Sequence, residues 1–310
     1  MSAAKKEEEI DTMHCCANCG VAGGDDITLK RCNGCHLMRY CGVKCQRDHW
    51  PKHKRECKKK AAELKDEILF KQPESSYLGD CPICCLPLPI DQKKATLNAC
   101  CSKVICNGCH FANMNREFEG ELKRTCPFCR KAAPKTREEI NEQMMKRVKV
   151  NDPVAICDVG TGRYHKGDYN SALEYWTKAA DLGYVHAHFQ LSILYQFGEG
   201  VEKDEKKEFH HLTEAAIAGH PAARCNLACL EGRNGRVDRA AKHYIIAAKL
   251  GCDASLQGVK NLHKAGLVSK EDLVAALRGH QAAIDATTSP QREEAKEYAE
   301  WVAERKRRGV

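Results

Sequence analysis

Cysteine residues at short, regular spacings crowd the first 130 residues of this 310-residue chain, which holds 21 cysteines in all. Many come in pairs separated by two residues, and a histidine at position 53 joins them. Such a pair suits a tetrahedral metal ion, because a tight turn brings both thiolates to one side of the ion. Zinc prefers four sulfur or nitrogen ligands in this geometry. The chemistry that these residues predict is therefore zinc binding.

The first set of ligands spans residues 16–57 and is large enough for two tetrahedral zinc sites. Its members are Cys16, Cys19, Cys32, Cys35, Cys41, Cys45, His53 and Cys57. So short a segment buries too little apolar surface to fold alone, so metal binding must supply its folding free energy. A disulfide framework is the alternative, but no secretory signal precedes these cysteines, which indicates a reducing compartment. Cys15 is predicted to be spare, because Cys16 has the two-residue spacing to Cys19.

Together with Tyr40 and Trp50, these ligands resemble a MYND zinc finger at nearly every position. One departure is His49, where the family often has an acidic residue before the tryptophan. The resemblance implies two interleaved, or cross-braced, zinc sites. One would be held by Cys16, Cys19, Cys41 and Cys45, and the other by Cys32, Cys35, His53 and Cys57.

MYND fingers bind short proline-containing peptides, so the resemblance also predicts a binding surface for protein partners. Gln46 and Trp50 occupy the positions at which the family contacts such peptides. The simpler interpretation is that Trp50 packs inside the finger and that Gln46 lies on a solvated helix face. The basic residues between positions 52 and 60 fit a solvated helix end better than a contact with nucleic acid or an acidic partner.

A second set of eight cysteines spans residues 81–129 and again suffices for two zinc sites. This set resembles a RING finger, in the variant that has cysteine in place of the usual histidine. The resemblance implies cross-bracing here too. It would place Cys81, Cys84, Cys106 and Cys109 on one zinc ion and Cys100, Cys101, Cys126 and Cys129 on the other, for four ions per chain. Cys85 is predicted to be spare, because Cys81 and Cys84 have the two-residue spacing.

The adjacent pair Cys100 and Cys101 departs from the usual RING spacing. Side chains of neighbouring residues diverge in an extended chain, so both reach one ion only if the local backbone is distorted. We expect both to be ligands. The alternative is that one thiol is unused and that His110 or another donor completes the site.

RING fingers hold a ubiquitin-conjugating enzyme and its thioester-linked ubiquitin in an attack-ready pose, which is catalysis by orientation. No residue of this chain is therefore expected to perform covalent catalysis. By resemblance, Ile83 and Pro127 present apolar contacts to the conjugating enzyme. Arg130 follows the last ligand, where a guanidinium fork would bridge conjugating enzyme and ubiquitin. The structural alternative is that the first two only shape the turns and that Arg130 is a surface residue.

The second half of the chain carries an internal repeat, in which an alanine pair, a glycine and a further small residue recur at offsets of 36 and 32 residues. The copies begin at Ala179, Ala215 and Ala247. Periods of this length predict an α-solenoid of helix pairs, each of which buries its apolar face on the next. With Gly-Glu-Gly-Val at 198–201, the pattern resembles the Sel-like subclass of tetratricopeptide repeats. We expect three helix pairs and a partial fourth.

The predicted fold is multidomain, with two small zinc-organised α+β fingers followed by an all-α solenoid of helical repeats. The expected order is a disordered N-terminus at 1–15, a MYND-type finger at 16–57, a helical linker at 58–80, a RING-type finger at 81–130, a second helical linker at 131–150, the repeats at 151–284 and a charged, partly frayed C-terminal helix or tail at 285–310. Thr136 and Asp152 are the expected N-caps of the helices before and after residue 150. The scattered histidines of the second half, with Cys225 and Cys229, are expected to be packing or surface residues.

Charge and hydropathy argue against two other classes of function, nucleic-acid binding and membrane association. The net charge of +8 is spread as +5, +1 and +2 over residues 1–60, 61–160 and 161–310, so a dedicated nucleic-acid binder is not expected. The mean hydropathy is −0.55. No apolar run approaches the roughly 18 residues of a bilayer span, so we expect no membrane partner. The expected location is intracellular, in the cytoplasm, the nucleus or both.

These features predict a zinc-dependent RING-type ubiquitin ligase whose MYND finger and repeats recruit protein substrates. The alternative is a non-catalytic scaffold, including a nuclear transcriptional adaptor, whose fingers and repeats only bind proteins. A lysine methyltransferase also comes into consideration, because MYND fingers accompany SET domains in some enzymes. It is disfavoured here, because helical repeats occupy the remaining length and no segment resembles a methyl-donor site.

Overall fold

The computed structural model describes residues 14–308 of the chain. The chain divides into two compact units, Met1–Lys71 and Gln72–Val310. The disordered N-terminus predicted for residues 1–15 lies almost entirely outside the described residues. Within the described part, none of the helices is both long enough and apolar enough to cross a membrane.

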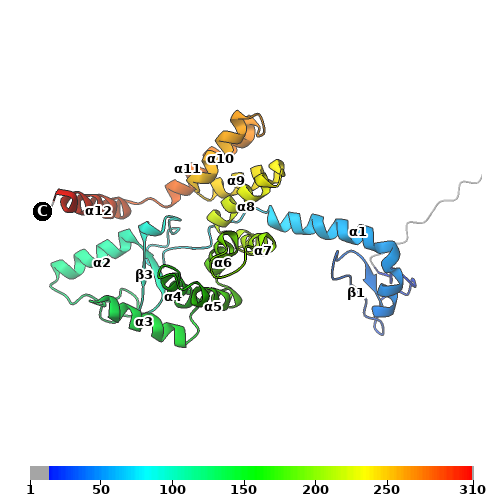
Figure 1. The fold of residues 1–310 in the computed structure, drawn as a ribbon, viewed down its shortest axis with the longest axis horizontal. Coiled ribbons are helices and arrows are strands. Elements are labelled where there is room, and N and C mark those ends of the chain that lie inside the picture. The colour runs from blue at the N-terminus through cyan, green and yellow to red at the C-terminus, as the bar shows by residue number, and fades with distance from the viewer. Residues whose placement is uncertain (1–13, 309–310) are drawn as a thin grey trace, which may run out of the picture. The chain divides into compact units, whose positions relative to one another are not determined.

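The first unit is a small finger continued by one long helix (Figure 1). Strands β1 (Lys30–Arg31) and β2 (Arg39–Tyr40) pair antiparallel, and helix α1 (Val43–Leu69) follows. Sulfur atoms take up most of the interior, since the buried cluster consists of Cys16, Cys32, Cys35, Tyr40 and Cys57. With so little aliphatic core, the finger depends on metal–ligand bonds for its stability.

Helix α1 ends earlier than the helical linker predicted over residues 58–80, so the second part of that prediction is wrong. The helix stops at Leu69, because the proline at position 73 disfavours helical conformation in the residue before it. The chain after Pro73 belongs to the second unit and lies against the helical repeats. There the backbone N–H of Tyr77 donates to the carbonyl oxygen of Gly219 at 3.1 Å.

The second unit begins with a zinc-finger-like module. A short 3-10 helix, η1 (Gln92–Lys94), leads into a hairpin of β3 (Ala95–Asn98) and β4 (Lys103–Cys106), and α2 (Asn107–Glu119) follows β4 without a break. Helix α3 (Arg137–Lys149) comes next, and its predicted cap is confirmed, since Thr136 Oγ1 accepts from the N–H of Glu139 at 3.2 Å.

Helices α4 to α11 form the predicted solenoid, drawn in green, yellow and orange in Figure 1. Their bounds are α4 (Pro153–Tyr164), α5 (Tyr169–Asp181), α6 (Val185–Phe197), α7 (Glu205–Ile217), α8 (Pro221–Arg233), α9 (Val237–Lys249), α10 (Asp253–Lys264) and α11 (Lys270–Ala286). Asp152 caps the first of them by accepting from the N–H groups of Val154 and Ala155. The fourth pair, α10 and α11, is complete in the described chain, although only part of it was expected.

The repeated small residues explain how these helices pack. Ala179 and its counterparts Ala215 and Ala247 are all fully buried, at the ends of α5, α7 and α9. A glycine then closes each of these helices in the left-handed conformation, with φ of 81° at Gly183. A small side chain near the helix end allows the next helix to approach closely, which is why the pattern recurs once per pair.

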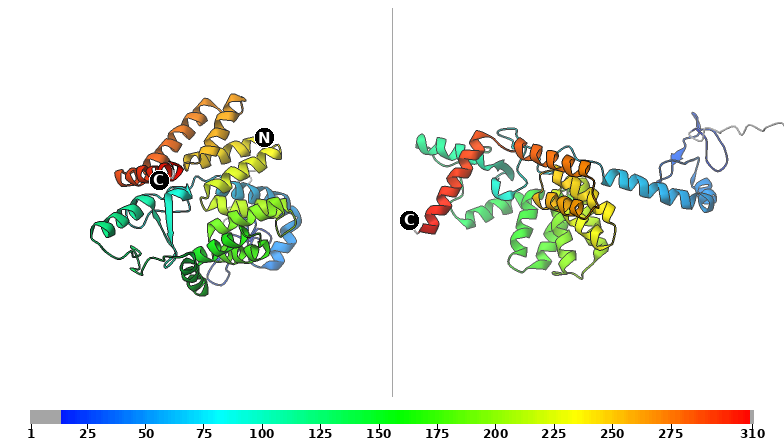
Figure 2. Two further views of the ribbon diagram at one scale, coloured as in Figure 1. Left: turned by 60° about the vertical axis from the view of Figure 1, so that its left-hand side comes forward. Right: turned by 90° about the horizontal axis from the view of Figure 1, so that it is seen from above.

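The C-terminal segment is helix α12 (Pro290–Arg308), which packs on α2 (Figures 1 and 2). The rings of Phe111 and Tyr298 lie 4.9 Å apart, centroid to centroid. The backbones approach so closely at Gly108 that a Cβ atom there would lie 3.0 Å from the Cα of Arg292. A charged, partly frayed helix or tail was expected here; the described part of this segment is a helix, and its docking on α2 was not foreseen.

Candidate metal centres

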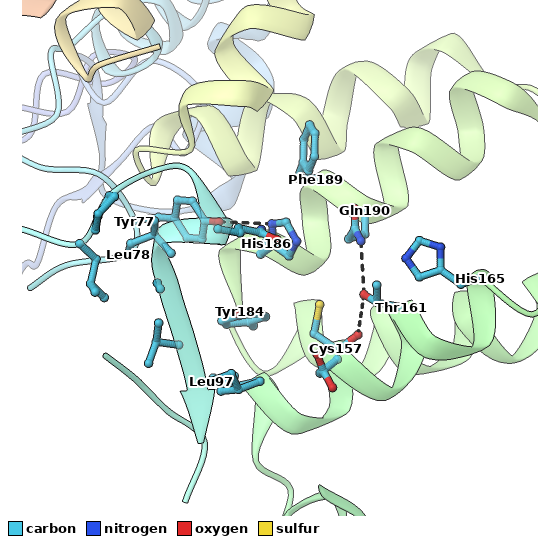
Figure 3. Close-up of a pocket in the computed structure, with 17 residues that line it drawn as sticks. Tyr77, Leu78, Leu97, Cys157, Thr161, His165, Tyr184, His186, Phe189 and Gln190 are labelled. Carbon is cyan, nitrogen blue, oxygen red and sulfur yellow. Dashed lines mark hydrogen bonds between the residues drawn. The ribbon is translucent and has the colours of Figure 1, made fainter. Parts of the chain in front are cut away.

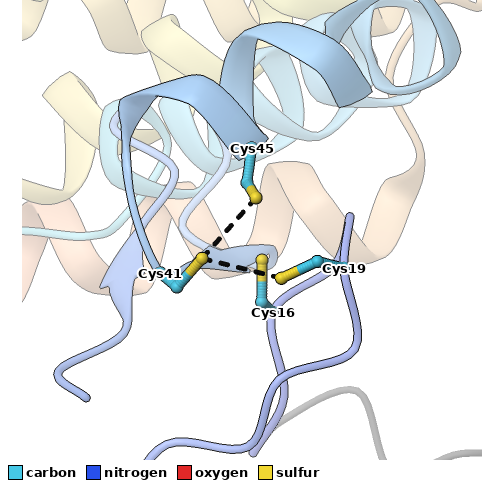
Figure 4. A group of neighbouring side chains, drawn as sticks. All are labelled: Cys16, Cys19, Cys41 and Cys45. Carbon is cyan, nitrogen blue, oxygen red and sulfur yellow. Dashed lines mark hydrogen bonds between the residues drawn. The ribbon is translucent and has the colours of Figure 1, made fainter. Parts of the chain in front are cut away.

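The first thiol group joins the loop before β1 to the start of α1 (Figure 4). The Sγ atom of Cys41 lies 3.6 Å from that of Cys19 and 3.5 Å from that of Cys45, and Cys16 completes the group. A disulfide would require an S–S distance of about 2.05 Å. Tetrahedral zinc, with Zn–S bonds of about 2.3 Å, places its sulfur ligands about 3.8 Å apart. The spacing therefore fits a zinc ion and not a disulfide.

The second group of the finger is buried throughout. The Sγ atoms of Cys32 and Cys57 are 3.6 Å apart, and the Sγ of Cys35 lies 3.3 Å from Nε2 of His53. His53 and Cys57 are one turn apart on α1, which puts both on one helix face. The two cysteines before them come from the turn between the strands. The two groups thus alternate along the chain, in the cross-braced order that the sequence predicts.

Hydrogen bonds to the sulfur atoms favour ionised ligands. Burial opposes ionisation of Cys16, but backbone N–H groups of three neighbouring residues donate to its sulfur, and its pKa falls to about 6. The pKa of Cys32 falls to about 6 in the same way. Burial and the nearby sulfurs instead raise the pKa of Cys57 to about 12. Thiolates this close repel one another, and a divalent cation removes that penalty, so the group is built for a metal ion.

A third group lies at the base of the hairpin in the second unit and consists of Cys81, Cys84, Cys106 and Cys109. The Sγ atoms of Cys84 and Cys106 are 3.8 Å apart, close to the tetrahedral zinc spacing. The N–H of Cys106 donates to the Sγ of Cys81 at 3.4 Å, and the N–H of Cys109 donates to the Sγ of Cys106 at 3.4 Å. Because α2 starts immediately after β4, the last residue of the strand and the first turn of the helix each supply one donor and one ligand.

The fourth group shows how Cys100 and Cys101 serve one site. Both lie in the turn between β3 and β4, which is not extended, because the N–H groups of Cys101 and Ser102 both donate to the carbonyl of Asn98. The Sγ of Cys100 lies 3.2 Å from that of Cys129. The Sγ of Cys101 lies 3.7 Å from its counterpart on Cys126.

The structure thus gathers the sixteen predicted ligands into the four predicted groups, within which all donor atoms lie within 4.8 Å of one another. His110 belongs to none of these groups, and neither do the spare thiols of Cys15 and Cys85. All 21 cysteines lie in the described chain, and none of them forms a disulfide there. The donor sets are those of zinc, so the chain has multiple zinc sites.

Sequence reasoning missed Arg292, which α12 brings to the third group. Its Nη2 lies 3.3 Å from the Sγ of Cys84 and donates to the carbonyl of Leu86 at 3.2 Å, while Nη1 donates to the carbonyl of Pro87 at 2.8 Å. Burial opposes the charge on Arg292, but the thiol groups of Cys84 and Cys106 raise its pKa overall. Burial likewise opposes ionisation of Cys84, yet a backbone N–H and Arg292 lower its pKa to about 7. More than 200 residues separate the partners, so no local pattern could indicate this contact.

The residues predicted to meet a conjugating enzyme lie on the two ligand loops of this module. Ile83 is 44% exposed although it sits between two ligands. Arg130 is exposed and has a φ of 56°, in the left-handed region that favours glycine. Pro127 is half-buried and lines a cavity of about 260 Å³ beside α2. The loops therefore present one apolar and one cationic side chain to solvent.

The predicted peptide contacts of the first finger lie on α1. Trp50 is 38% exposed, and its ring meets that of His53 edge-on, with centroids 6.3 Å apart. Gln46 is half-buried, and its Nε2 points to the Sγ of Cys32 at 3.9 Å. Both side chains thus touch the second zinc group, and the tryptophan keeps an exposed face. Peptide binding by these residues stays a prediction.

Family models match two parts of the chain. The MYND finger model matches residues 16–57, and the Sel1 repeat model matches residues 155–184, 185–220 and 221–252. The MYND and Sel-like predictions are therefore confirmed, as is the predicted fold class of zinc-organised fingers followed by a helical solenoid. Both kinds of module indicate protein–protein interaction. No family model supports the RING resemblance of residues 81–130.

Curated proteins match only short stretches. The chain is 57% identical over 30 residues to histone-lysine N-methyltransferase SMYD3 of Homo sapiens, which is 10% of this chain and 7% of that protein. It is 38% identical over 69 residues to Tudor domain-containing protein 1 of Oryzias latipes, or 22% of this chain and 6% of that protein. A SET domain and MYND-type zinc finger protein 6 of Schizosaccharomyces pombe is 32% identical over 60 residues, covering 19% of this chain and 12% of that protein.

Two solved structures resemble part of the fold. A Sel1 repeat protein from Oxalobacter formigenes is 23% identical, with a TM-score of 0.42, over 55% of this chain and 52% of that one. The protective antigen c5321 of uropathogenic Escherichia coli, which has an SLR fold, is 22% identical, with a TM-score of 0.34, over 53% of this chain and 37% of that one.

Proposed function

We propose that the protein is a RING-type ubiquitin ligase, in which residues 81–130 hold a ubiquitin-conjugating enzyme while the MYND finger and the Sel1 repeats recruit protein substrates. The observation that carries this proposal is the alternation of two four-thiol groups along residues 81–129. Cross-bracing fixes the two ligand loops relative to each other, because each zinc ion ties the first half of the module to the second.

The exposed side chains of these loops suit the role. Ile83, on the first loop, is 44% exposed and so offers apolar surface to a partner. Arg130, on the last loop, is exposed, and its rigid fork of donors can bridge two partner carbonyls. Ubiquitin transfer would then need no nucleophile of this chain, because holding the thioester in one reactive pose lowers the entropic barrier.

Recruitment would use the other modules. Trp50 and Gln46 on α1, together with the short β1–β2 edge, suit an extended proline-containing peptide that binds by strand addition. Twenty-one unpaired thiols, fifteen of them in metal groups, fit a reducing compartment, so we place the protein inside the cell, in the cytoplasm or the nucleus.

Discharge of a ubiquitin-loaded conjugating enzyme tests the proposal. The wild-type protein should accelerate discharge with at least one enzyme of a broad panel. Ile83→Ala should weaken binding of that enzyme, by about 1–2 kcal/mol for a lost apolar contact. Arg130→Ala should leave binding nearly unchanged and slow discharge. Leu267→Ala, which removes another exposed apolar side chain from the solenoid, and Arg278→Ala, on α11, are the matched controls.

If the protein accelerates discharge of no conjugating enzyme in the panel, the ligase proposal is wrong and the alternative of a non-catalytic scaffold takes its place. That alternative rests on the same MYND finger and repeats, which bind proteins in either case. Pull-downs with the Trp50→Ala variant would then still lose the partners that carry a proline motif.

A further inference from the structure

A cavity of about 450 Å³ lies where the first two helix pairs of the solenoid meet the segment after Pro73 and the β3–β4 hairpin (Figure 3). Helices α4 and α6 form one wall, and Tyr77 and Leu97 contribute to the other. The volume is within the range of pockets that hold a small ligand or a large side chain. It involves none of the sixteen metal ligands.

Aromatic rings form one end of this cavity. Tyr77 stacks on His186, with ring centroids 6.0 Å apart and planes 3° from parallel, and its hydroxyl lies 3.4 Å from Nδ1 of that histidine. Burial lowers the pKa of His186 to about 4, so this ring is neutral near pH 7. Tyr184 and Phe189 also line the cavity. Uncharged aromatic rings therefore line this end of the cavity, and those of Tyr77 and Phe189 also stack on the ring of His220.

The formal charge in the cavity comes from one carboxylate, that of Asp158 on α4. No lysine or arginine lines the cavity, and among the described residues Asp158 has no ion-pair or hydrogen-bond partner. The side chain is accessible, so its unpaired carboxylate can accept hydrogen bonds from a cationic group that enters the cavity.

The side chain of Gln190 supplies a second acceptor to the same cavity. The Nε2 of Gln190 donates to Oγ1 of Thr161 at 3.3 Å, and that hydroxyl donates to the carbonyl of Cys157 at 3.1 Å (Figure 3). These two hydrogen bonds orient the side-chain amide of Gln190, so that its nitrogen is engaged and its oxygen remains available as an acceptor. The cavity thus combines two hydrogen-bond acceptors, one of them charged, with aromatic rings.

We propose that this cavity is a recognition site for an arginine side chain of a protein partner. A guanidinium carries five N–H donors and no acceptor, which matches the carboxylate of Asp158 and the amide oxygen of Gln190. Its planar face stacks on aromatic rings, and it sheds water more readily than an ammonium group. An anion would meet an uncompensated carboxylate, and an apolar side chain would leave both acceptors unsatisfied. That the partner is a substrate rests on the proposed function, but the binding itself does not.

Binding of the blocked tripeptide acetyl-Gly-Arg-Gly-amide to the full-length protein, followed by isothermal titration and protein NMR, tests the site without any conjugating enzyme. Matched peptides carry citrulline, which has the same shape without charge, or lysine in place of arginine. We expect the arginine peptide to bind at least about tenfold more tightly than either. Asp158→Asn should abolish that preference, whereas Asp238→Asn, on the exposed face of α9, should preserve it.

Circular dichroism shows whether the Asp158→Asn variant is folded, and Gln190→Met, which keeps the side-chain length but removes the acceptor, provides an independent second variant. Equal affinity for arginine and citrulline, or the absence of binding up to about 10 mM peptide, would overturn the proposal. A lysine peptide that binds as well as the arginine peptide would overturn the choice of a guanidinium. Failure of ubiquitin discharge with intact arginine binding would refute only the ligase.

Discussion

A guanidinium 3.3 Å from the sulfur of Cys84 changes how firmly that residue holds a metal ion. Four thiolates around one zinc ion leave a net charge of −2, and Arg292 offsets part of it from a buried position. The same side chain ties down the carbonyls of Leu86 and Pro87, which follow the ligand. It thereby orients the ligand loop as well as balancing its charge.

We expect Arg292→Ala to weaken zinc binding at the third group by roughly 10- to 100-fold, as outer-sphere partners of metal sites commonly do. Arg292→Lys should recover part of the loss, because an ammonium supplies the charge but not the fork that reaches both the sulfur and the carbonyls. Competition with a chromogenic zinc chelator measures this. Arg307→Ala, on the exposed end of the same helix, should release zinc like the wild type. Equal release by all the variants would contradict this role.

The buried histidines of the solenoid make its stability sensitive to acid. Burial lowers the pKa of His186 to about 4, while an unfolded chain has a histidine pKa of about 6.5. Between these values the unfolded state takes up a proton that the folded state refuses, so stability falls as pH drops below about 6.5, by up to about 1.4 kcal/mol per pH unit.

His186→Gln should therefore reduce the loss of stability between pH 7 and pH 5 by about 2 kcal/mol. Glutamine can keep a hydrogen bond to His220, whose Nε2 lies 3.0 Å from Nδ1 of His186. Urea unfolding followed by the helical signal at both pH values, with zinc in excess, measures the difference. A variant that loses as much stability as the wild type over this interval would show that His186 does not contribute.

At the scale of single elements, the sequence predicts those features that depend on residues close together in the chain. The two-residue cysteine pairs and the Thr136 and Asp152 caps follow from neighbours in the chain, and the structure contains them. Whether Cys100 and Cys101 could both bind one ion depended on the position of the turn between β3 and β4. The docking of α12 on α2 could not be predicted, because its few apolar residues stand among many charged ones and its anchor, Arg292, is a charged residue whose partner Cys84 lies more than 200 residues away.

Helix α4 offers a matched pair of glycines that tests the packing of the first repeat. A Cβ atom at Gly160 would lie 2.7 Å from Cδ1 and 2.8 Å from Nε1 of Trp176, which is fully buried and donates from Nε1 to the carbonyl of Cys157. A Cβ atom at Gly162 would meet nothing within 4 Å.

Gly160→Ala should therefore destabilise the solenoid by about 1–3 kcal/mol, because the tryptophan must move and loses its hydrogen bond. Gly162→Ala should stabilise it by up to about 1 kcal/mol, through helix propensity alone. Chemical denaturation of the two variants, measured side by side, tests these opposite changes in the free energy of unfolding. Changes of the same sign in both variants would mean that the tight contact at Trp176 does not constrain the fold.

At the scale of the whole molecule, the chain carries two kinds of stability. The first unit and residues 81–129 depend on thiol groups that only a cation can hold together. The solenoid has ordinary hydrophobic clusters, one around Trp176 and another around Val259, and neither contains a metal ligand. The sharp fall in cysteine content after residue 130 predicts this division. It does not predict that the second finger, the repeats and α12 belong to one compact unit, since that depends on contacts between distant segments.

Metal removal should therefore act unevenly on the protein. Native mass spectrometry of chain purified without chelator should show four zinc ions, one for each thiol group. Excess chelator should remove them and unfold the fingers, while the repeat helices keep most of their far-ultraviolet circular dichroism, because no ligand belongs to their cores.

Helix α12 should lose its protection from proteases at the same time, since Arg292 and Gly108 anchor it to the third metal group. Re-addition of zinc serves as the control and should restore that protection. Two ions or fewer per chain would contradict the four zinc sites. A collapse of the whole helical signal with the metal would show that the repeats and the fingers are not independent.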